Sequence, residues 1–74
     1  MLSMKEQKKQ LGAIRRFVQQ ADPHEFHTAL GDLRTQISDV WASARDSRNE
    51  PVLRGLQDTQ VRIRALTGEF IPLI

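Results

Sequence analysis

The chain has 74 residues, a formal net charge of +2 and no cysteine. A chain of this length forms one small domain, here 1–74, and its single core leaves only a small net stability. The lack of cysteine excludes disulfide frameworks, thiolate metal sites and cysteine nucleophiles. Residues 1–10 are polar and charged, unlike a signal peptide, and no segment approaches the roughly 20 apolar residues of a membrane span. We therefore expect a cytoplasmic protein without a membrane span.

The first predicted element is an amphipathic helix over about 4–20. Ser3 precedes Glu6 by three residues, which is the spacing of a capping box at a helix start. Apolar residues recur on one side of this helix, and cations occupy the opposite side. These cations form the basic face: Lys5, Lys8, Lys9, Arg15 and Arg16. Residues 1–21 thus have a net charge of +4, whereas residues 22–74 have a net charge of −2.

A second and longer helix is predicted over about 23–46. Pro23 should end the first helix and is itself favoured at the first position of a new one, with Asp22 as the N-cap. Apolar side chains then recur at steps of four and three, which places them on one face. They are Phe26, Leu30, Leu33, Ile37, Val40 and Ala44. Ala29 and Trp41 widen this stripe, so we expect two neighbouring elements to cover it.

A third helix is predicted over about 51–67, after a polar run that indicates a turn. Val52, Leu56 and Ile63 repeat the same spacing, and Gly68 stands where a left-handed C-cap residue is favoured. A short connection between two long amphipathic helices predicts an antiparallel hairpin. The predicted fold class is therefore all-α: a three-helix bundle in which the hairpin, about 23–46 and 51–67, is covered by the basic N-terminal helix.

The chain ends in an apolar tail: Phe70, Ile71, Pro72, Leu73 and Ile74. Pro72 disfavours a helix, so we expect an extended segment. Two roles are open for this tail. In the first, Phe70 continues the apolar stripe of the third helix and the tail closes the open end of the bundle. In the second, the tail is an exposed ligand for a partner protein.

No motif for catalysis or cofactor binding is found. His24 and His27 are three residues apart, but a zinc site needs a third or fourth convergent ligand. No serine has the Gly-x-Ser-x-Gly setting of a nucleophile elbow, and the four glycines are too dispersed for a phosphate-binding loop. We predict that the protein is not an enzyme and has no metal and no cofactor.

The leading hypothesis is a non-catalytic protein-binding module, a small bacterial or phage-type regulator, inhibitor or co-chaperone that acts by occupying a larger protein partner. It follows from the lack of catalytic motifs and from two surplus surfaces, the basic face and the apolar tail. One alternative is a nucleic-acid-associated regulator of transcription, with the basic face on phosphates. Another is a structural homodimer whose hairpins pair into a four-helix bundle. A solvated surface is the plainest account of the basic face.

Replacing Leu33 or Ile37 with Asp should unfold the domain, because either change places an unpaired charge in the predicted core. Far-ultraviolet circular dichroism and thermal melting measure the result. A variant that kept its helicity and its melting temperature would show that this face is not the buried one.

Overall fold

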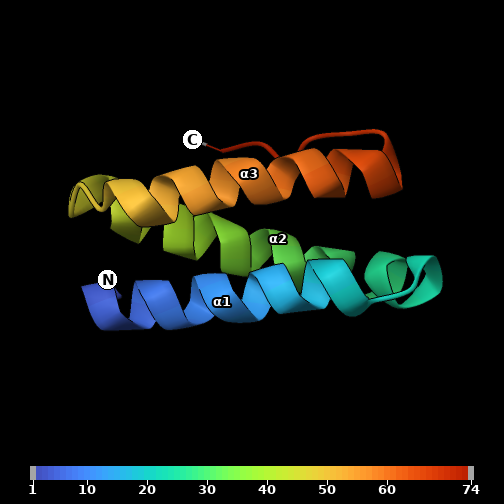
Figure 1. The fold of residues 1–74 in the computed structure, drawn as a ribbon, viewed down its shortest axis with the longest axis horizontal. Coiled ribbons are helices and arrows are strands. Elements are labelled where there is room, and N and C mark those ends of the chain that lie inside the picture. Colours follow the sequence, from blue (N-terminus) through green and yellow to red (C-terminus); the bar gives the residue numbers. More distant parts are fainter. Residues whose placement is uncertain (1, 74) are drawn as a thin grey trace.

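The computed structural model describes residues 2–73, which form three helices and no strand: α1 (Met4–Gln20), α2 (Pro23–Asp46) and α3 (Glu50–Thr67). Each helix packs against the other two in a bundle of 33 × 18 × 18 Å. Helices α1 and α3 run parallel to each other, and α2 runs antiparallel to both (Figure 1). The predicted all-α three-helix fold is confirmed.

Side chains cap the first two helices at the predicted residues. The hydroxyl of Ser3 accepts a hydrogen bond from the backbone N–H of Glu6 at 3.1 Å, and the carboxylate of Asp22 accepts one from the N–H of Glu25 at 2.8 Å. The Glu25 N–H stabilises the ionised carboxylate and so lowers the pKa of Asp22. Pro23 directly follows this cap, so α1 and α2 meet at a corner with almost no loop.

Helix α3 begins at Glu50, one residue earlier than predicted. The backbone of Arg48 has a φ of 55°, in the left-handed region, and this reverses the chain after α2. The next N–H, that of Asn49, then donates to the carbonyl of Ala44 at 2.8 Å. At the other end, Gly68 has a φ of 82° and ends α3 in the predicted left-handed cap.

The core lies where the apolar faces of the three helices meet. Its members are almost fully buried, and Phe26 stacks on Phe17 across the corner between α1 and α2 with ring centres 6.3 Å apart. The buried apolar residues are Leu11, Ile14, Val18, Phe26, Leu33, Ile37, Val40, Ala44, Val52, Leu56, Ile63 and Ile71. The stripe of α2 is thus covered from two sides within one chain.

The tail after α3 folds back along that helix (Figure 1). The side-chain carbonyl of Gln60 accepts from the N–H of Ile71 at 2.8 Å, and its amide donates to the carbonyl of the same residue. Ile71 is consequently buried, and Leu73 packs partly against the core. Phe70 does not continue the α3 stripe, because α3 ends before it, and it lies 52% exposed with the Arg64 guanidinium 4.9 Å from the ring centre. Ile74 lies outside the described residues.

Helices α1 and α3 approach closely where Leu11 meets Gly55. A Cβ atom added to Gly55 would lie 2.6 Å from Cδ2 of Leu11, which is far inside van der Waals contact. A β-branched residue at this position would add further atoms on the same side. Because Gly55 has no side chain, the Leu11 side chain can pack against its backbone, and the two parallel helices can approach closely at this point.

We expect Gly55→Val to destabilise the protein by about 1–3 kcal/mol, because the added atoms displace the buried Leu11 side chain that packs between α1 and α3. The matched control is Gly31→Val, since a Cβ at Gly31 meets nothing within 4 Å. Valine is a better helix former than glycine, so the control should be neutral or slightly stabilising. Urea unfolding measures both, and equal stabilities would contradict the close approach.

Candidate partner-binding groove between α1 and α3

The structure divides the predicted basic face between two sides of α1. Lys5, Lys8 and Arg15 line a groove between α1 and α3. Lys9 instead lines a separate groove between α1 and α2. Arg16 is exposed, and its Nε–H donates to the carbonyl of Gly12, one turn earlier in α1, at 3.3 Å. None of the five cations forms an ion pair with a carboxylate of residues 2–73.

The groove between α1 and α3, called here the α1/α3 groove, combines an apolar floor with a cationic rim. Its volume is about 620 Å³. Apolar side chains from both helices form the floor: Met4 and Leu11 from α1, Pro51 and Val52 from α3. Met4 is 55% exposed and Pro51 is also exposed, whereas Leu11 and Val52 belong to the core and are 7% and 3% exposed. The groove therefore offers a ligand both apolar contact and positive charge.

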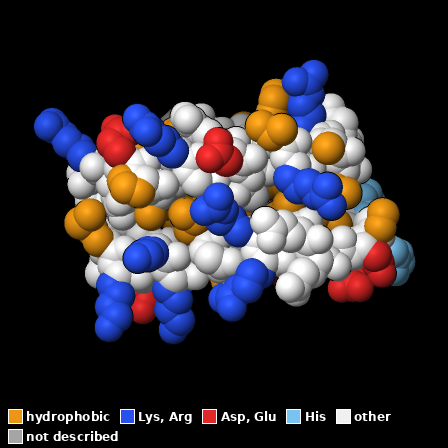
Figure 2. Space-filling model, viewed as in Figure 1, with side chains coloured by type: hydrophobic (Ala, Val, Ile, Leu, Met, Phe, Trp, Pro, Cys, Tyr) orange, Lys and Arg blue, Asp and Glu red, His pale blue; other side chains and the backbone are white. Residues whose placement is uncertain are grey.

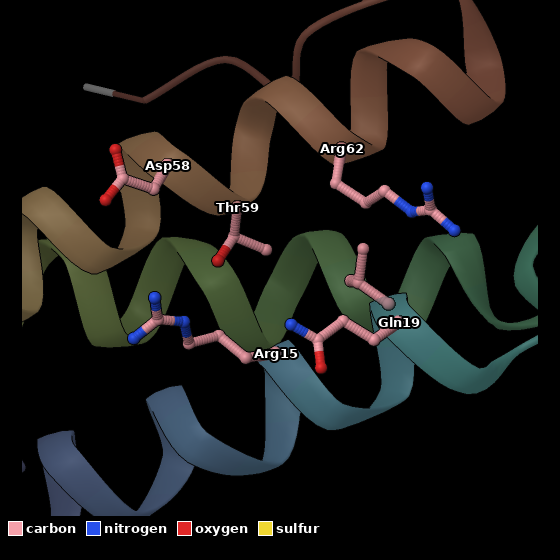
Figure 3. A pocket seen from close by; sticks show the side chains of 6 residues that line it. Arg15, Gln19, Asp58, Thr59 and Arg62 are labelled. Carbon is pink, nitrogen blue, oxygen red and sulfur yellow. The ribbon is translucent and has the colours of Figure 1, made fainter.

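Beyond Arg15 the groove continues into a second hollow of about 280 Å³. Arg15 and Gln19 from α1 lie opposite Asp58, Thr59 and Arg62 from α3 (Figure 3). The two hollows thus follow one line along the α1–α3 contact.

Gly12 explains why the α1/α3 groove is open. It lies on the wall of the groove, and a Cβ added to it would meet no atom within 4 Å. A larger side chain at this position would occupy the space between α1 and the start of α3. Two glycines therefore shape the groove, Gly55 by bringing the helices together and Gly12 by leaving the wall bare.

The face that contains the groove is mainly cationic. Figure 2 shows Lys and Arg side chains over both α1 and α3, with hydrophobic side chains between them and few carboxylates. The groove between α1 and α2 is different, because Glu6, Asp32 and Asp39 line it together with Lys9. The charge asymmetry predicted between the two parts of the sequence thus becomes an asymmetry between two sides of the molecule.

A buried polar network builds the end of the groove where the chain starts. Gln7 is fully buried, and its amide donates to the carbonyl of Leu2 at 2.9 Å and to the Ser47 hydroxyl at 3.1 Å. Its side-chain carbonyl accepts from the amide of Asn49 at 3.0 Å. Asn49 also lines the groove, so Gln7 holds the α2–α3 turn against α1 at the groove's end.

The sequence-based prediction missed Gln7. A signal existed, because Gln7 precedes Leu11 by four residues and Ile14 by seven, so it continues the apolar stripe of α1 towards its start. A glutamine in such a stripe indicates a buried hydrogen-bond partner. Which partner it finds depends on residues about 40 positions away in the sequence, and helical spacing alone does not reveal them.

The two histidines do not form a metal site with the acidic residues around them. His24 and His27 are both exposed in the first turns of α2. Within residues 2–73, no group of three or more His, Cys, Asp or Glu side chains could hold a metal ion. Over the same residues, no helix has both the length and the apolar character needed to cross a membrane.

Comparison with known proteins adds no family assignment. No protein-family model, no curated protein and no solved structure matches the chain.

Gln7→Leu should destabilise the protein by about 1–3 kcal/mol, because the buried amide of Asn49 and the carbonyl of Leu2 would lose their partner. Gln20→Leu, at the exposed end of α1, is the matched control and should change stability by less than about 0.5 kcal/mol. Urea unfolding followed by circular dichroism measures both variants. If Gln7→Leu were as stable as the control, the network would not be holding this end of the groove.

Proposed function

We propose that this protein is a non-catalytic protein-binding module that acts by occupying a larger protein partner through the α1/α3 groove. The observation that supports the proposal is the pair of exposed apolar side chains in the groove, Met4 and Pro51, beside a rim of cations that pair with no carboxylate of residues 2–73. A surface that serves only solubility has no need of exposed apolar side chains.

The floor also favours a protein partner over a nucleic acid. A phosphodiester backbone would use the cations but would leave the exposed Met4 and Pro51 without apolar contacts. Single-stranded nucleic acids are usually held by stacking on aromatic rings, and no aromatic residue lines the α1/α3 groove. A nucleic-acid-associated regulator remains the second candidate, because cations from both helices share this face (Figure 2).

The other two surfaces considered from the sequence support a partner less well. Among the described tail residues 70–73, Ile71 is buried and is hydrogen-bonded to Gln60 in both directions, Leu73 is half-buried, and Phe70 and Pro72 are exposed. The apolar stripe of α2 is covered within the chain, since Leu33 and Ile37 are 4% and 1% exposed. We therefore do not propose a homodimer that buries this stripe.

The test compares two variants that change the net charge equally. The groove variant is Lys8→Glu with Arg15→Glu, and the control variant is Lys9→Glu with Arg16→Glu, one residue further along in each case. The wild type and both variants, each immobilised by a terminal tag, are exposed to an extract of the source cells, with and without nuclease treatment, at about 50 and 200 mM salt. Captured proteins are identified, purified separately and titrated against the wild type by calorimetry.

We expect a protein that binds the wild type and the control variant with one-to-one stoichiometry at both salt concentrations. Its binding to the groove variant should be at least about tenfold weaker. Binding that is lost on nuclease treatment, or that falls equally in both variants and steeply with salt, would replace the proposal with the nucleic-acid candidate. A purified partner that bound the groove variant as tightly as the wild type would contradict the proposed surface.

A further inference from the structure

We propose that the partner segment that occupies the α1/α3 groove is an acidic amphipathic helix, which packs beside α1 and α3 as the fourth helix of a bundle. This inference rests on the proposed function and adds the chemistry of the partner. It is carried by three properties of the groove: its straight shape, the spacing of its cations and its apolar floor.

The groove is straight because one row of α1 forms its wall. Met4, Lys8, Leu11 and Arg15 are separated by four, three and four residues, which is a single row along a helix. Eleven residues of helix rise correspond to about 17 Å, or about three turns. Since α3 runs parallel to α1 along this length, the groove is a linear channel between two parallel helices (Figure 1). A third rod fits such a channel as helices do in bundles.

The three cations on the rim are separated along α1 by about one and about two helical turns. Lys8 follows Lys5 by three residues and Arg15 follows Lys8 by seven, so their rises along α1 are about 4.5 and 10.5 Å. A helix aligned with α1 would present carboxylates at the same intervals if they stood three and seven residues apart. Of the residues that line the two hollows, Asp58 alone is acidic, so the chain itself neutralises little of this rim.

The apolar floor requires that the acidic helix be amphipathic. Met4 and Pro51, the exposed apolar residues of the groove, would contact an apolar ridge of the partner, while its flanking carboxylates meet the rim. The acidic groove between α1 and α2 of a second copy does not supply such a ridge, because Ala13 is the only apolar residue in a lining that is otherwise polar or charged.

The probe is a synthetic, end-capped peptide of about 18 residues with leucines on one helical face and glutamates flanking them. Three comparison peptides are used: a scrambled one of identical composition, one with proline at its centre, and one with lysine in place of glutamate. Short single-stranded and duplex DNA serve as polyanions without an apolar face. Fluorescence anisotropy at about 150 mM salt gives affinities, and amide chemical shifts locate the contact.

Two pairs of variants locate the contact independently. The first pair is the groove variant and the control variant defined above. The second pair is Met4→Gln, on the floor, and Val61→Gln, on the outer side of α3, where the side chain is 66% exposed. Because Met4 is itself 55% exposed, its replacement should leave the fold intact. Thermal melting establishes that each variant is folded before its affinity is compared.

We expect the acidic amphipathic peptide to bind, to gain helicity on binding and to shift the amides of Leu11, Gly12 and Val52. The groove variant should bind it at least about tenfold more weakly than the control variant, and Met4→Gln at least about threefold more weakly than Val61→Gln. The scrambled, proline-containing and lysine-containing peptides should bind at least about tenfold more weakly than the probe.

Three results would overturn the inference. They are no binding of the probe at about 1 mM, equal binding of the probe and its scrambled form, and DNA that binds more tightly than the probe with equal losses in the groove and control variants. If the probe fails while the captured protein still depends on the groove, the proposed function stands and only the acidic helix is wrong. If the captured protein is also indifferent to the groove variant, both fail.

Discussion

Every other feature of this protein depends on the burial of one apolar stripe along α2. Phe26, Ile37 and Val40 on this stripe are each 1% exposed or less. The stripe is too wide for a single covering helix, so α1 and α3 lie side by side upon it. Two parallel cylinders on a third leave a valley on their outer side. The α1/α3 groove is that valley, and a fourth helix is the element that would fill it in a larger bundle.

Two buried glutamines fix how neighbouring segments lie against this small core. Gln7 joins α1 to the α2–α3 turn through Asn49, and Gln60 joins α3 to the tail through Ile71. Within residues 2–73, no buried side-chain nitrogen or oxygen lacks a hydrogen-bond partner. Helices packed only by apolar contacts can slide past each other, whereas a buried side-chain amide keeps its hydrogen bonds in only one arrangement of the helices. The position of α1 relative to the start of α3 is therefore set by hydrogen bonds as well as by packing.

Local sequence signals were sufficient to predict the three helices. The caps Ser3 and Asp22 and the glycine at position 68 stand at the predicted ends, because capping depends on residues within one helical turn. The contacts that hold the turn before α3 and the course of the tail were not predictable in this way. Asn49 is held by Gln7, 42 residues before it, and Ile71 by a side chain of α3. Contacts of this kind exist only once the helices have packed.

The candidate site was predictable only in part, for a geometrical reason. The helical pattern of α1 identified its cations, but it could not show which neighbour lies beside each of them. Lys8 and Lys9 are adjacent in sequence and differ by about 100° around the helix, so one faces α3 and the other faces α2. The floor needs residues of two helices, and neither helix alone shows an apolar patch there.

The same geometry explains why the charge asymmetry of the sequence matters. Isolated surface cations contribute little to stability, and their pairing with acids across α1 would contribute little more. On this molecule Lys8 and Arg15 lie on the α3 side, while Asp32 and Asp39 lie on the α2 side. The resulting field has a direction, and its positive side coincides with the α1/α3 groove, where the apolar side chains of Met4 and Pro51 are exposed. The rim cations and the exposed apolar side chains thus lie on the same surface of α1 and α3.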